Sequence, residues 1–271
     1  MKIDKIVKNF KSIQKGELKP IKPLSVYGLD IIACKNLNKQ FMGIKAIDNL
    51  TINIPQAQTT GLIGPNGSGK TTLMNILTGM LKPDSGEIRV RDKIRKRIKS
   101  HELRKYRIAR TFQDGRLIEQ LSVEDNLLLP VADNTIFGGL KEVKQDDYKA
   151  RMEQVLEITS LTEHRHKKAE ELSYGLRKLL EIGRLLMQDA EINFFDEPFT
   201  GLFPEIVEKV CDIIGGLQKQ GKTIVIIEHN MGLIKRLSDH IIVLDHGTLL
   251  AEGRPDFVLK NKAVREAYLG V

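Results

Sequence analysis

The sequence has no long hydrophobic run and only two cysteines, and both shortages narrow the possible functions. No window approaches the ~18 consecutive apolar residues of a membrane-spanning helix, so we expect any membrane role to depend on a partner. The N-terminus carries lysines but no contiguous apolar stretch, unlike a secretory signal. Cys34 and Cys211 lie far apart, and we expect both to be buried, reduced thiols of a cytoplasmic protein rather than redox or metal groups.

Histidine and cysteine do not cluster at zinc-ligand spacing, and the chain has no internal repeat or low-complexity segment. Its 271 residues are 41% apolar and 29% charged, as in ordinary soluble globular proteins. This length fits one large α/β domain or a domain with an inserted lobe.

The net charge of +8 is concentrated in two segments. Residues 1–23 carry seven Lys against two acidic residues, and residues 89–107 carry ten Lys and Arg against two. The remainder of the chain is therefore net negative. This pattern indicates two local basic surfaces rather than a generally cationic protein.

We interpret the first thirty residues as a basic amphipathic N-terminal extension and linker. Apolar residues recur there at helical spacing, with lysines on the other faces, and Gly16, Pro20 and Pro23 end the pattern. Such a helix suits an anionic membrane surface or a membrane subunit. A helix docked on its own domain and a loose arm remain equally open.

A complete phosphate-binding pattern occupies residues 64–71, directly after the apolar run 60–63. Its glycines let the backbone curl so that successive N–H groups point at phosphate oxygens. Lys70 would reach the β- and γ-phosphates, and the Thr71 hydroxyl can ligate Mg²⁺. A helix is predicted to follow over Thr72–Leu77, and the positive end of its dipole would face the phosphates. We therefore predict a nucleoside triphosphate site formed by Gly64, Pro65, Asn66, Gly67, Ser68, Gly69, Lys70, Thr71 and Thr72.

Short strands and helices alternate over most of the chain. Apolar segments predict strands at Ile31–Leu37, Ala46–Ile54, Glu191–Phe195, Thr223–Ile227 and Ile241–Leu244. An apolar stripe predicts a helix from Pro204 to about Gln220, and residues from about 114 to 185 are polar and helical in pattern. Continuous apolar strands alternating with helices indicate an α/β fold with a buried, mostly parallel sheet.

Two carboxylates end the apolar strand at Asp196 and Glu197. The carboxyl edge of a parallel sheet is where P-loop proteins hold Mg²⁺, so we expect Asp196 to bind the ion directly or through water. Glu197, the next residue, is placed to orient or deprotonate an attacking water.

Ser173 precedes a helix predicted over Arg177–Met187 and is a good N-cap. A helix N-terminus with Ser and Gly can also hold the γ-phosphate of a nucleotide bound elsewhere. Together with the P-loop and the Asp-Glu strand, Leu172-Ser173-Tyr174-Gly175-Leu176 resembles the signature loop of the ATP-binding-cassette (ABC) ATPase family, which reads Leu-Ser-Gly-Gly-Gln. Tyr174 and Leu176 replace the third and fifth residues, while Ser173 and Gly175, the phosphate-contacting pair, are kept.

The resemblance covers about residues 31–271 and implies further roles. Gln113 matches the Q-loop glutamine that senses Mg²⁺ and water, and His229 matches the switch histidine that contacts the γ-phosphate. Phe41 lies where the family places an aromatic residue on adenine. The implied fold is a RecA-like P-loop NTPase core with an antiparallel β subdomain and a helical subdomain inserted at about 114–185.

Four short segments narrow the resemblance to the branched-chain amino-acid (Liv-type) or urea uptake ATPases, with lipopolysaccharide-export ATPases next. They are residues 109–113, 123–127, 180–184 and 267–270. The resemblance implies an ATPase that binds ATP and Mg²⁺ and pairs with a second cassette, identical or not. It also implies integral membrane permease subunits as partners, at the inner face of the cell membrane, with Ser122 capping a helix over Val123–Leu129 in the lobe that transmits the motion. Asp114, Arg116 and residues 119–121 are expected near the groove for a membrane subunit.

One residue departs from the family pattern at the dimer interface. Phe203 stands where the D-loop usually has Asp or Asn. A phenyl ring cannot replace that residue's hydrogen bonds, so we expect a homodimer to hydrolyse ATP slowly and a second, different cassette to restore the rate. The competing view is that Phe203 packs against the first turn of the helix beginning at Pro204.

Other functional classes fit less well. An ABC ATPase for translation or DNA repair would have two cassettes or a long coiled coil, so we expect no nucleic-acid partner. A soluble ATPase for iron–sulfur cluster assembly is a closer rival. A small-molecule P-loop kinase would lack the signature loop and His229.

Overall fold

The computed structural model describes residues 30–112, 117–131 and 145–269, which fall into two compact units, each described by itself. The sheet unit contains residues 30–110, 190–198 and 217–269, and the helical unit contains residues 111–189 and 199–216. Within the described ranges, no helix is long and apolar enough to cross a membrane. The extension predicted over residues 1–30 lies outside the described residues, apart from Asp30.

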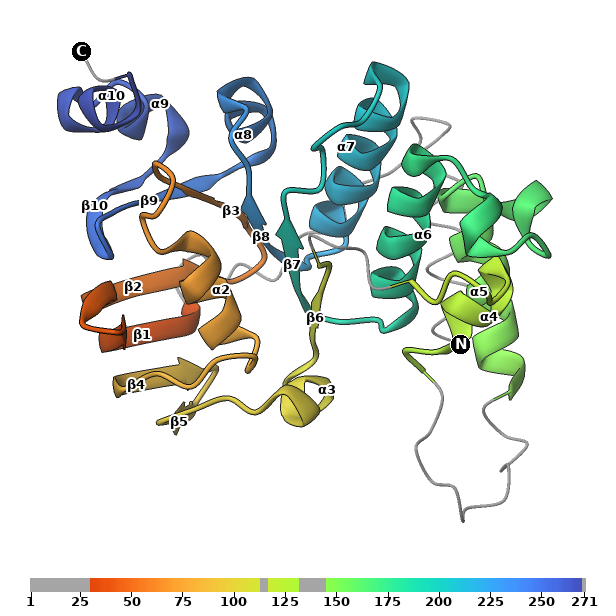
Figure 1. Ribbon diagram of the computed structural model, residues 1–271, viewed down its shortest axis with the longest axis horizontal. Helices are drawn as coiled ribbons and strands as arrows, with labels where there is room; N and C mark the ends of the chain where they lie inside the picture. Colours follow the sequence, from red (N-terminus) through yellow and green to blue (C-terminus); the bar gives the residue numbers. More distant parts are fainter. Residues whose placement is uncertain (1–29, 113–116, 132–144, 270–271) are drawn as a thin grey trace. The chain divides into compact units, whose positions relative to one another are not determined.

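A six-stranded, mostly parallel sheet forms the centre of the sheet unit, in the order β10-β9-β3-β8-β7-β6 (Figure 1). Every residue of β3, β7 and β8 is buried, which explains their uninterrupted apolar sequences. Because these strands are parallel, their carboxyl ends meet at one edge of the sheet. The strands are β3 (Thr59–Ile63), β6 (Ile108–Arg110), β7 (Ile192–Asp196), β8 (Thr223–Ile227), β9 (His240–Asp245) and β10 (Thr248–Gly253).

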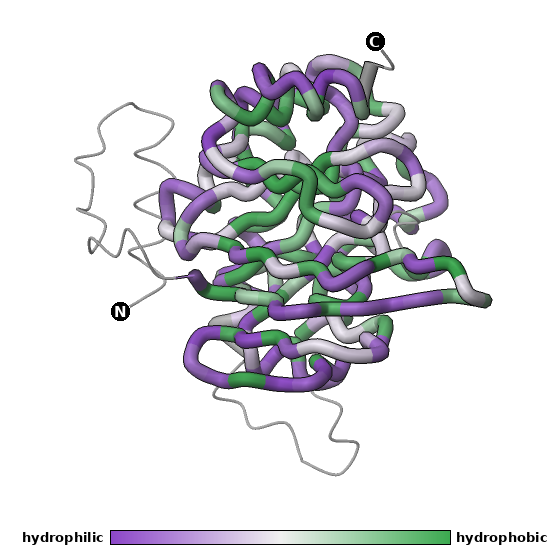
Figure 2. The backbone as a smooth tube through the Cα atoms, turned by 90° about the vertical axis from the view of Figure 1, so that its left-hand side faces the viewer, coloured by the Kyte–Doolittle hydropathy of each residue, from purple (hydrophilic) through white to green (hydrophobic). Residues whose placement is uncertain are grey.

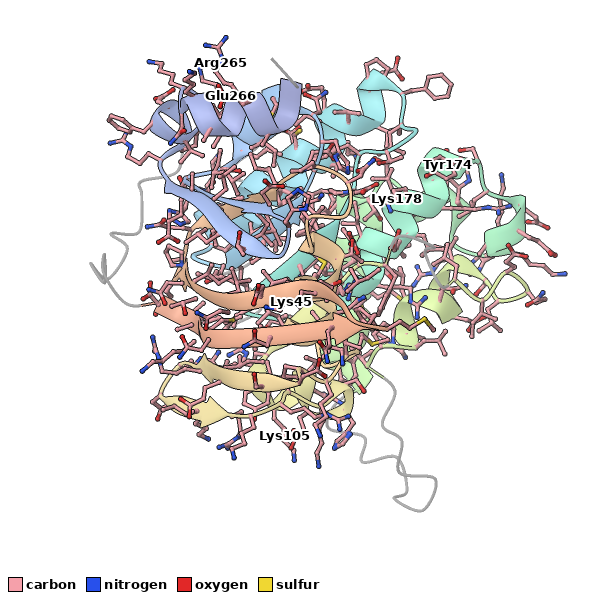
Figure 3. The ribbon with its side chains drawn as sticks, turned by 60° about the vertical axis from the view of Figure 1, so that its left-hand side comes forward. Lys45, Lys105, Tyr174, Lys178, Arg265 and Glu266 are labelled. Atoms are coloured by element: carbon pink, nitrogen blue, oxygen red, sulfur yellow. The ribbon has the colours of Figure 1, made fainter. Side chains whose placement is uncertain are left out.

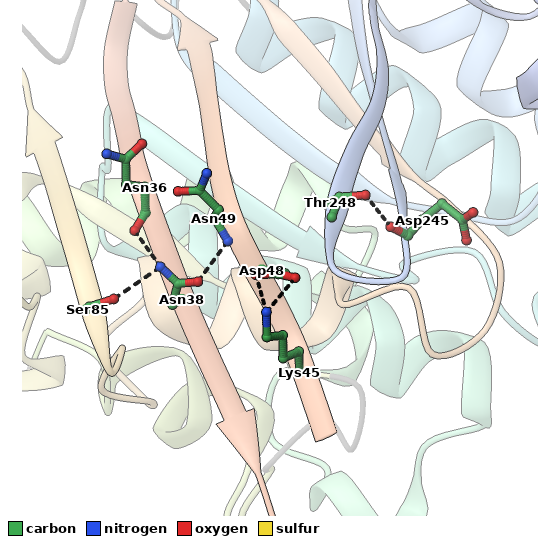
Figure 4. Close-up of polar contacts among 8 residues, drawn as sticks. All are labelled: Asn36, Asn38, Lys45, Asp48, Asn49, Ser85, Asp245 and Thr248. Carbon is green, nitrogen blue, oxygen red and sulfur yellow. Dashed lines mark hydrogen bonds and ion pairs between the residues drawn. The ribbon is translucent and has the colours of Figure 1, made fainter. Parts of the chain in front are cut away.

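A four-stranded antiparallel sheet lies beside it, in the order β2-β1-β4-β5. Its strands are β1 (Asp30–Phe41), β2 (Ile44–Pro55), β4 (Ser85–Val90) and β5 (Lys93–Arg95). The Asn38 amide nitrogen donates to Asn36 O (2.9 Å) and Ser85 Oγ (3.1 Å), and Asn38 Oδ1 accepts from Asn49 N (2.8 Å) (Figure 4). One side chain therefore ties three strands together where the register of β1 shifts.

Helix α2 (Lys70–Leu77) is packed between the two sheets (Figure 1). Its buried residues Leu73, Met74, Ile76 and Leu77 join one core cluster with strands of both sheets. A smaller cluster unites β3 and β9 with the C-terminal helices α8 (Met231–Leu237), α9 (Pro255–Val258) and α10 (Lys262–Leu269). Figure 2 shows the hydrophobic strands in the interior and mostly hydrophilic turns around them.

The helical unit contains α4 (Val123–Leu128), α5 (Gln145–Ile158), α6 (Tyr174–Met187) and most of α7 (Pro204–Lys219). Short 3₁₀ turns at Thr162–His164 and Ala169–Glu171 connect α5 to α6. The predicted cap is confirmed, since Ser122 Oγ accepts from Asp125 N at 3.0 Å. Helix α4 ends one residue before the expected Leu129.

Several predicted boundaries were too short. Strand β1 continues beyond Leu37 to Phe41, because its backbone still pairs with β2 where its side chains are polar. Helix α6 begins at Tyr174 rather than Arg177, directly after the Ser173 cap. No helix or strand was predicted in the basic segment 89–107. The structure shows there the end of β4, the whole of β5, a 3₁₀ turn at Ser100–Glu102 and helix α3 (Leu103–Tyr106).

The predicted α/β fold class is confirmed, as is the burial of both thiols. Cys34 and Cys211 are free, buried cysteines. Burial raises the pKa of the Cys34 thiol to about 12.

Candidate nucleotide site

The loop between β3 and α2 is pressed against backbone carbonyls of neighbouring strands. A Cβ at Gly64 would lie 2.2 Å from Leu244 O, and a Cβ at Gly69 would lie 2.4 Å from Ala46 O. Both glycines also have positive φ, 153° and 101°. Glycine is therefore needed at these two positions for space as well as for backbone conformation.

Lys70 begins α2, and its side chain folds back over this loop. Its Nζ donates to Gly64 O (2.8 Å) and Pro65 O (2.9 Å), and the residue is only 6% exposed. Burial lowers the pKa of Lys70, and the negative charges of Glu197 and Asp196 oppose that shift. The ammonium is thus electrostatically coupled to the carboxylates at the end of β7.

The remaining predicted P-loop residues differ in their exposure to solvent. Ser68 is buried, and its N–H donates to Pro65 O at 3.1 Å. Asn66, Gly67 and Thr71 are exposed, while Thr72 is half-buried. The exposed residues include the hydroxyl that we predicted to ligate Mg²⁺.

Two predicted catalytic residues, Glu197 and His229, meet the predicted metal ligand Asp196 at the ends of β7 and β8. Asp196 is 2% exposed, and the next residue, Glu197, is half-buried. Glu197 Oε1 lies 3.1 Å from Nε2 of His229. The structure therefore brings Lys70, Asp196, Glu197 and His229 into one region, as the strand order requires.

The backbone at Glu197 is in the left-handed region, with φ +46°. Such a conformation is uncommon for a residue with a Cβ and clusters at functional sites. Glu197 N donates to Ile227 O at 3.0 Å, which fixes this turn to the end of β8. The carboxylate is thus held at the sheet edge by its backbone as well as by His229.

Arg110, at the end of β6, is a site residue that the sequence did not single out. Its Nη2 contacts Asp196 Oδ2 at 2.7 Å, and its Nη1 reaches Asn75 Oδ1 (2.5 Å) and Thr78 Oγ1 (2.9 Å). The side chains of Arg110 and Asp196 are 5% and 3% exposed. A buried guanidinium therefore connects the carboxylate predicted to bind Mg²⁺ to the helix that follows the P-loop.

Glu228 supports the loop that carries His229. Its Oε1 accepts hydrogen bonds from His229 N (2.8 Å) and Asn230 N (2.9 Å), and the residue is 6% exposed. Asn230 Oδ1 in turn caps α8 by accepting from Gly232 N and Leu233 N. The sequence showed only that an acidic residue directly precedes His229, and it did not show that this residue is buried.

In the helical unit, Ser173 caps α6, as predicted, and its Oγ accepts from Leu176 N at 3.5 Å. Tyr174, the residue that departs from the family motif, donates its hydroxyl to Thr200 O at 3.1 Å. Its ring also lies over Gly201, where a Cβ would be 3.2 Å from Tyr174 Cε1. The predicted signature segment and the start of the predicted D-loop are therefore in direct contact.

Gln113 lies outside the described residues, but the residue before it is firmly held. Phe112 N donates to Glu181 Oε1 at 2.6 Å, and Glu181 Oε2 lies 3.0 Å from Lys178 Nζ. Burial raises the pKa of Glu181, and the Lys178 cation opposes the shift. A buried acid of α6 thus anchors the backbone where the predicted Q-loop begins.

Phe41 and Phe203, two further predicted positions, are both exposed. Phe41, at the end of β1, is 46% exposed, and Lys39 Nζ lies 5.3 Å from its ring centroid. Phe203 is 80% exposed, so it does not pack tightly against the first turn of α7. Its carbonyl accepts from Ile206 N (3.0 Å) and Val207 N (3.1 Å), so only its backbone supports that turn.

Comparison with known proteins decides the family. A family model described as ABC transporter matches residues 47–200, more than half of the chain. The chain belongs to the ABC transporter ATPase family. A second model, described as branched-chain amino acid ATP-binding cassette transporter, matches residues 248–271 of this ABC ATPase.

Curated relatives match this ABC ATPase over nearly their full length. A protein of Salmonella typhimurium, named high-affinity branched-chain amino acid transport ATP-binding protein LivG, is 34% identical over 249 residues, which cover 89% of this chain and 98% of the relative. A probable LivG of Methanocaldococcus jannaschii is 34% identical with the same coverage. BraF of Pseudomonas aeruginosa is 33% identical, again over 89% and 98%.

Solved structures agree with the family assignment. A nucleotide-free ATP-binding cassette from an ABC transporter is 34% identical, with a TM-score of 0.78 over 90% of this chain and 100% of that chain. The ADP conformation of another cassette is 33% identical, with a TM-score of 0.79 and the same coverage. The predicted identity as a nucleotide-binding ABC ATPase, the ATP-binding subunit of a transporter, is confirmed.

Proposed function

We propose that this ABC ATPase powers uptake of branched-chain amino acids, or a similar small polar solute, through separate integral membrane permease subunits. The names of the relatives and the match at residues 248–271 support this substrate class. In this proposal the protein works at the inner face of the cell membrane. The cassette would occupy residues 31–271, with the helical insertion at about 114–185.

Hydrolysis in this proposal depends on the contact between Glu197 and His229. The Glu197 carboxylate orients or deprotonates the attacking water, and His229, held 3.1 Å away, contacts the γ-phosphate. Lys70 supplies a cation to the β- and γ-phosphates, and it exchanges its loop carbonyl partners for them. The backbone of the P-loop and Phe41, stacked on adenine, complete the ATP site.

The residues present fit a P-loop magnesium site. Mg²⁺ in such sites needs few protein ligands, because phosphates and water supply the others. Thr71 offers an exposed hydroxyl, and Asp196 offers a carboxylate whose other oxygen is already fixed by Arg110. Thr71, Asp196 and Gln113 would hold the ion, which neutralises developing charge on the phosphates when bound.

A second cassette completes the ATP site in this proposal, through its own Ser173 and Gly175. A dimeric cassette bound to ADP and Pi, 27% identical with a TM-score of 0.72, supports this pairing; it covers 83% of this chain and 98% of that chain. The exposed Phe203 would lie at the interface, where it cannot provide a D-loop hydrogen bond. We therefore expect pairing with a different cassette to hydrolyse ATP faster than the homodimer.

The hydrolysis mechanism is tested by Glu197→Gln, measured by size-exclusion chromatography with light scattering and by phosphate release. We expect ATP binding to persist, turnover to fall by roughly 10²-fold or more, and a closed dimer to accumulate. Glu163→Gln, at an exposed position of a 3₁₀ turn, is the matched control and should leave turnover unchanged. A variant that binds ATP yet remains monomeric contradicts the dimer mechanism.

The transport assignment is tested by deleting the gene and measuring uptake of labelled leucine, with complementation by the intact chain and by Glu197→Gln. The proposal is supported if the intact chain restores leucine uptake and Glu197→Gln does not. Unchanged leucine uptake with defective lipopolysaccharide export would instead support an export ATPase. Co-purification with soluble partners only would support cluster assembly.

A further inference from the structure

A basic segment includes β5, the edge strand of the four-stranded sheet. It comprises residues 89–107, from the end of β4 through β5 and the 3₁₀ turn to α3, and we call it the β5–α3 surface. The segment has ten Lys and Arg against two acidic residues. Figure 3 shows Lys105 pointing away from the ribbon at this edge.

Some cations of this surface already have acidic partners, and others have none among the described residues. Arg91 and Arg107 both form ion pairs with Glu191. Five other cations of the surface are exposed and have no acidic partner among the residues that the structure describes. These are Lys93, Lys96, Arg97, Lys99 and Lys105.

The surface is anchored to the core. The Ile98 side chain is fully buried in the middle of the charged turn, and Tyr106 is 8% exposed. Arg95 Nε donates to Tyr106 Oη at 3.2 Å, which connects β5 to α3. The turn also passes close to the end of α2, where a Cβ at Gly79 would lie 2.6 Å from Ser100 N. The cations are therefore presented by ordered backbone.

The described part of the chain begins beside this surface, at Asp30 and Ile31. Arg91 N donates to Ile31 O (2.7 Å), and Arg89 Nη1 donates to Asp30 O (3.3 Å). Residues 1–23, with their seven lysines, precede this point in the sequence. The first described residues, Asp30 and Ile31, therefore contact the start of the β5–α3 surface.

We propose that the β5–α3 surface docks on the anionic headgroups of a lipid bilayer and holds the ATPase close to its membrane subunits. The proposal rests on the proposed function, because it assumes a protein that works at a membrane. Each Lys or Arg near an anionic bilayer raises the partition coefficient of a protein onto that bilayer about five-fold at moderate salt. Five unpaired cations therefore suffice for reversible membrane binding. Ile94, 57% exposed between Lys93 and Arg95, places an apolar group where it can enter the headgroup layer.

The composition of the surface fits lipid better than nucleic acid. Single-stranded nucleic acid is usually bound by exposed aromatic side chains on which the bases stack. Tyr106 is the single aromatic residue in 89–107, and it is buried. Cations around an exposed aliphatic side chain match a bilayer surface instead.

The test is co-sedimentation of the full chain with vesicles of phosphatidylcholine alone or with 30% phosphatidylglycerol, at low and high salt. The test variant replaces the five unpaired cations by Gln. We expect its partitioning onto anionic vesicles to fall at least about 10-fold, with little binding of either protein to neutral vesicles. The control removes the same charge elsewhere, with Gln at Lys149, Lys167, Lys219, Lys260 and Lys262, and should change partitioning less than two-fold.

Further measurements separate the possible failures. Nucleotide binding and ATPase activity of the five-Gln variant should equal those of the parent, which shows that the fold and the proposed function are intact. Deleting residues 1–23 should weaken vesicle binding in a salt-dependent way, and adding the five substitutions should weaken it further. If the deletion weakens vesicle binding but the five substitutions do not, the proposal is overturned. Tighter binding to a 20-nucleotide RNA than to anionic vesicles at equal salt overturns it too, as does loss of permease co-purification with unchanged vesicle binding.

Discussion

Arg110→Met should destabilise the sheet unit far more than removal of an exposed arginine. The guanidinium is 2.7 Å from Asp196, and both side chains are almost completely buried. Without it, Asp196 would lose its buried guanidinium partner in the interior, and Asn75 and Thr78 would lose a donor. Breaking a buried pair in this way costs about 3–5 kcal/mol. For a chain of this size, that corresponds to a fall of about 10 °C in the unfolding midpoint.

Calorimetry and circular dichroism are the suitable assays, because the sequence contains no tryptophan for fluorescence. Arg107→Met is the matched control, since Arg107 also contacts an acid, Glu191, at 2.6 Å, but with 47% and 37% of the side chains exposed. That pair should contribute less than about 1 kcal/mol. The double variant Arg110→Met/Asp196→Asn removes the buried charge and should recover about 2 kcal/mol.

The reasoning would be refuted by equal unfolding midpoints for Arg110→Met and Arg107→Met. It would also fail if the double variant were less stable than Arg110→Met alone, because the buried Asp196 carboxylate would then not be the source of the loss. Either result would mean that Asp196 finds water or another donor after the substitution.

Three further outcomes follow from the described contacts. Lys70→Ala should abolish binding of a fluorescent ATP analogue, because the buried ammonium of the P-loop is lost; binding within about three-fold of the parent would contradict this role. Phe203→Asp should raise homodimer turnover, and an already brisk ATPase that is unchanged or slowed by the substitution would contradict the D-loop argument. Cys34, with its pKa raised to about 12, should resist a thiol reagent at pH 8 until urea is added; rapid labelling of the folded protein would show that it is accessible.

Motifs with strict local geometry could be predicted from the sequence. The P-loop, the carboxylates after β7 and the Ser122 and Ser173 caps depend on residues close together in the chain, so their sequence patterns are specific. The parallel order of β3, β7 and β8 then brings Lys70, Glu197 and His229 together.

Contacts between distant residues could not be predicted in the same way. Arg110 and Asp196 are 86 residues apart, and Phe112 and Glu181 are 69 apart. Nothing in the local pattern distinguishes these buried charges from the many exposed ones, because burial depends on packing. Strand β5 was missed for a related reason: all three of its residues are exposed, so it has no apolar alternation to indicate a strand.

The bond from Phe112 to Glu181 has a mechanical consequence for α6. Ser173, the predicted signature serine, caps the first turn of this helix, and Glu181 lies on its third turn. A helix of fourteen residues moves as a stiff rod, so a displacement that starts at Ser173 must pull on the peptide of Phe112. In the proposed dimer, nucleotide contact at Ser173 would thereby displace the peptide of Phe112, the residue before Gln113.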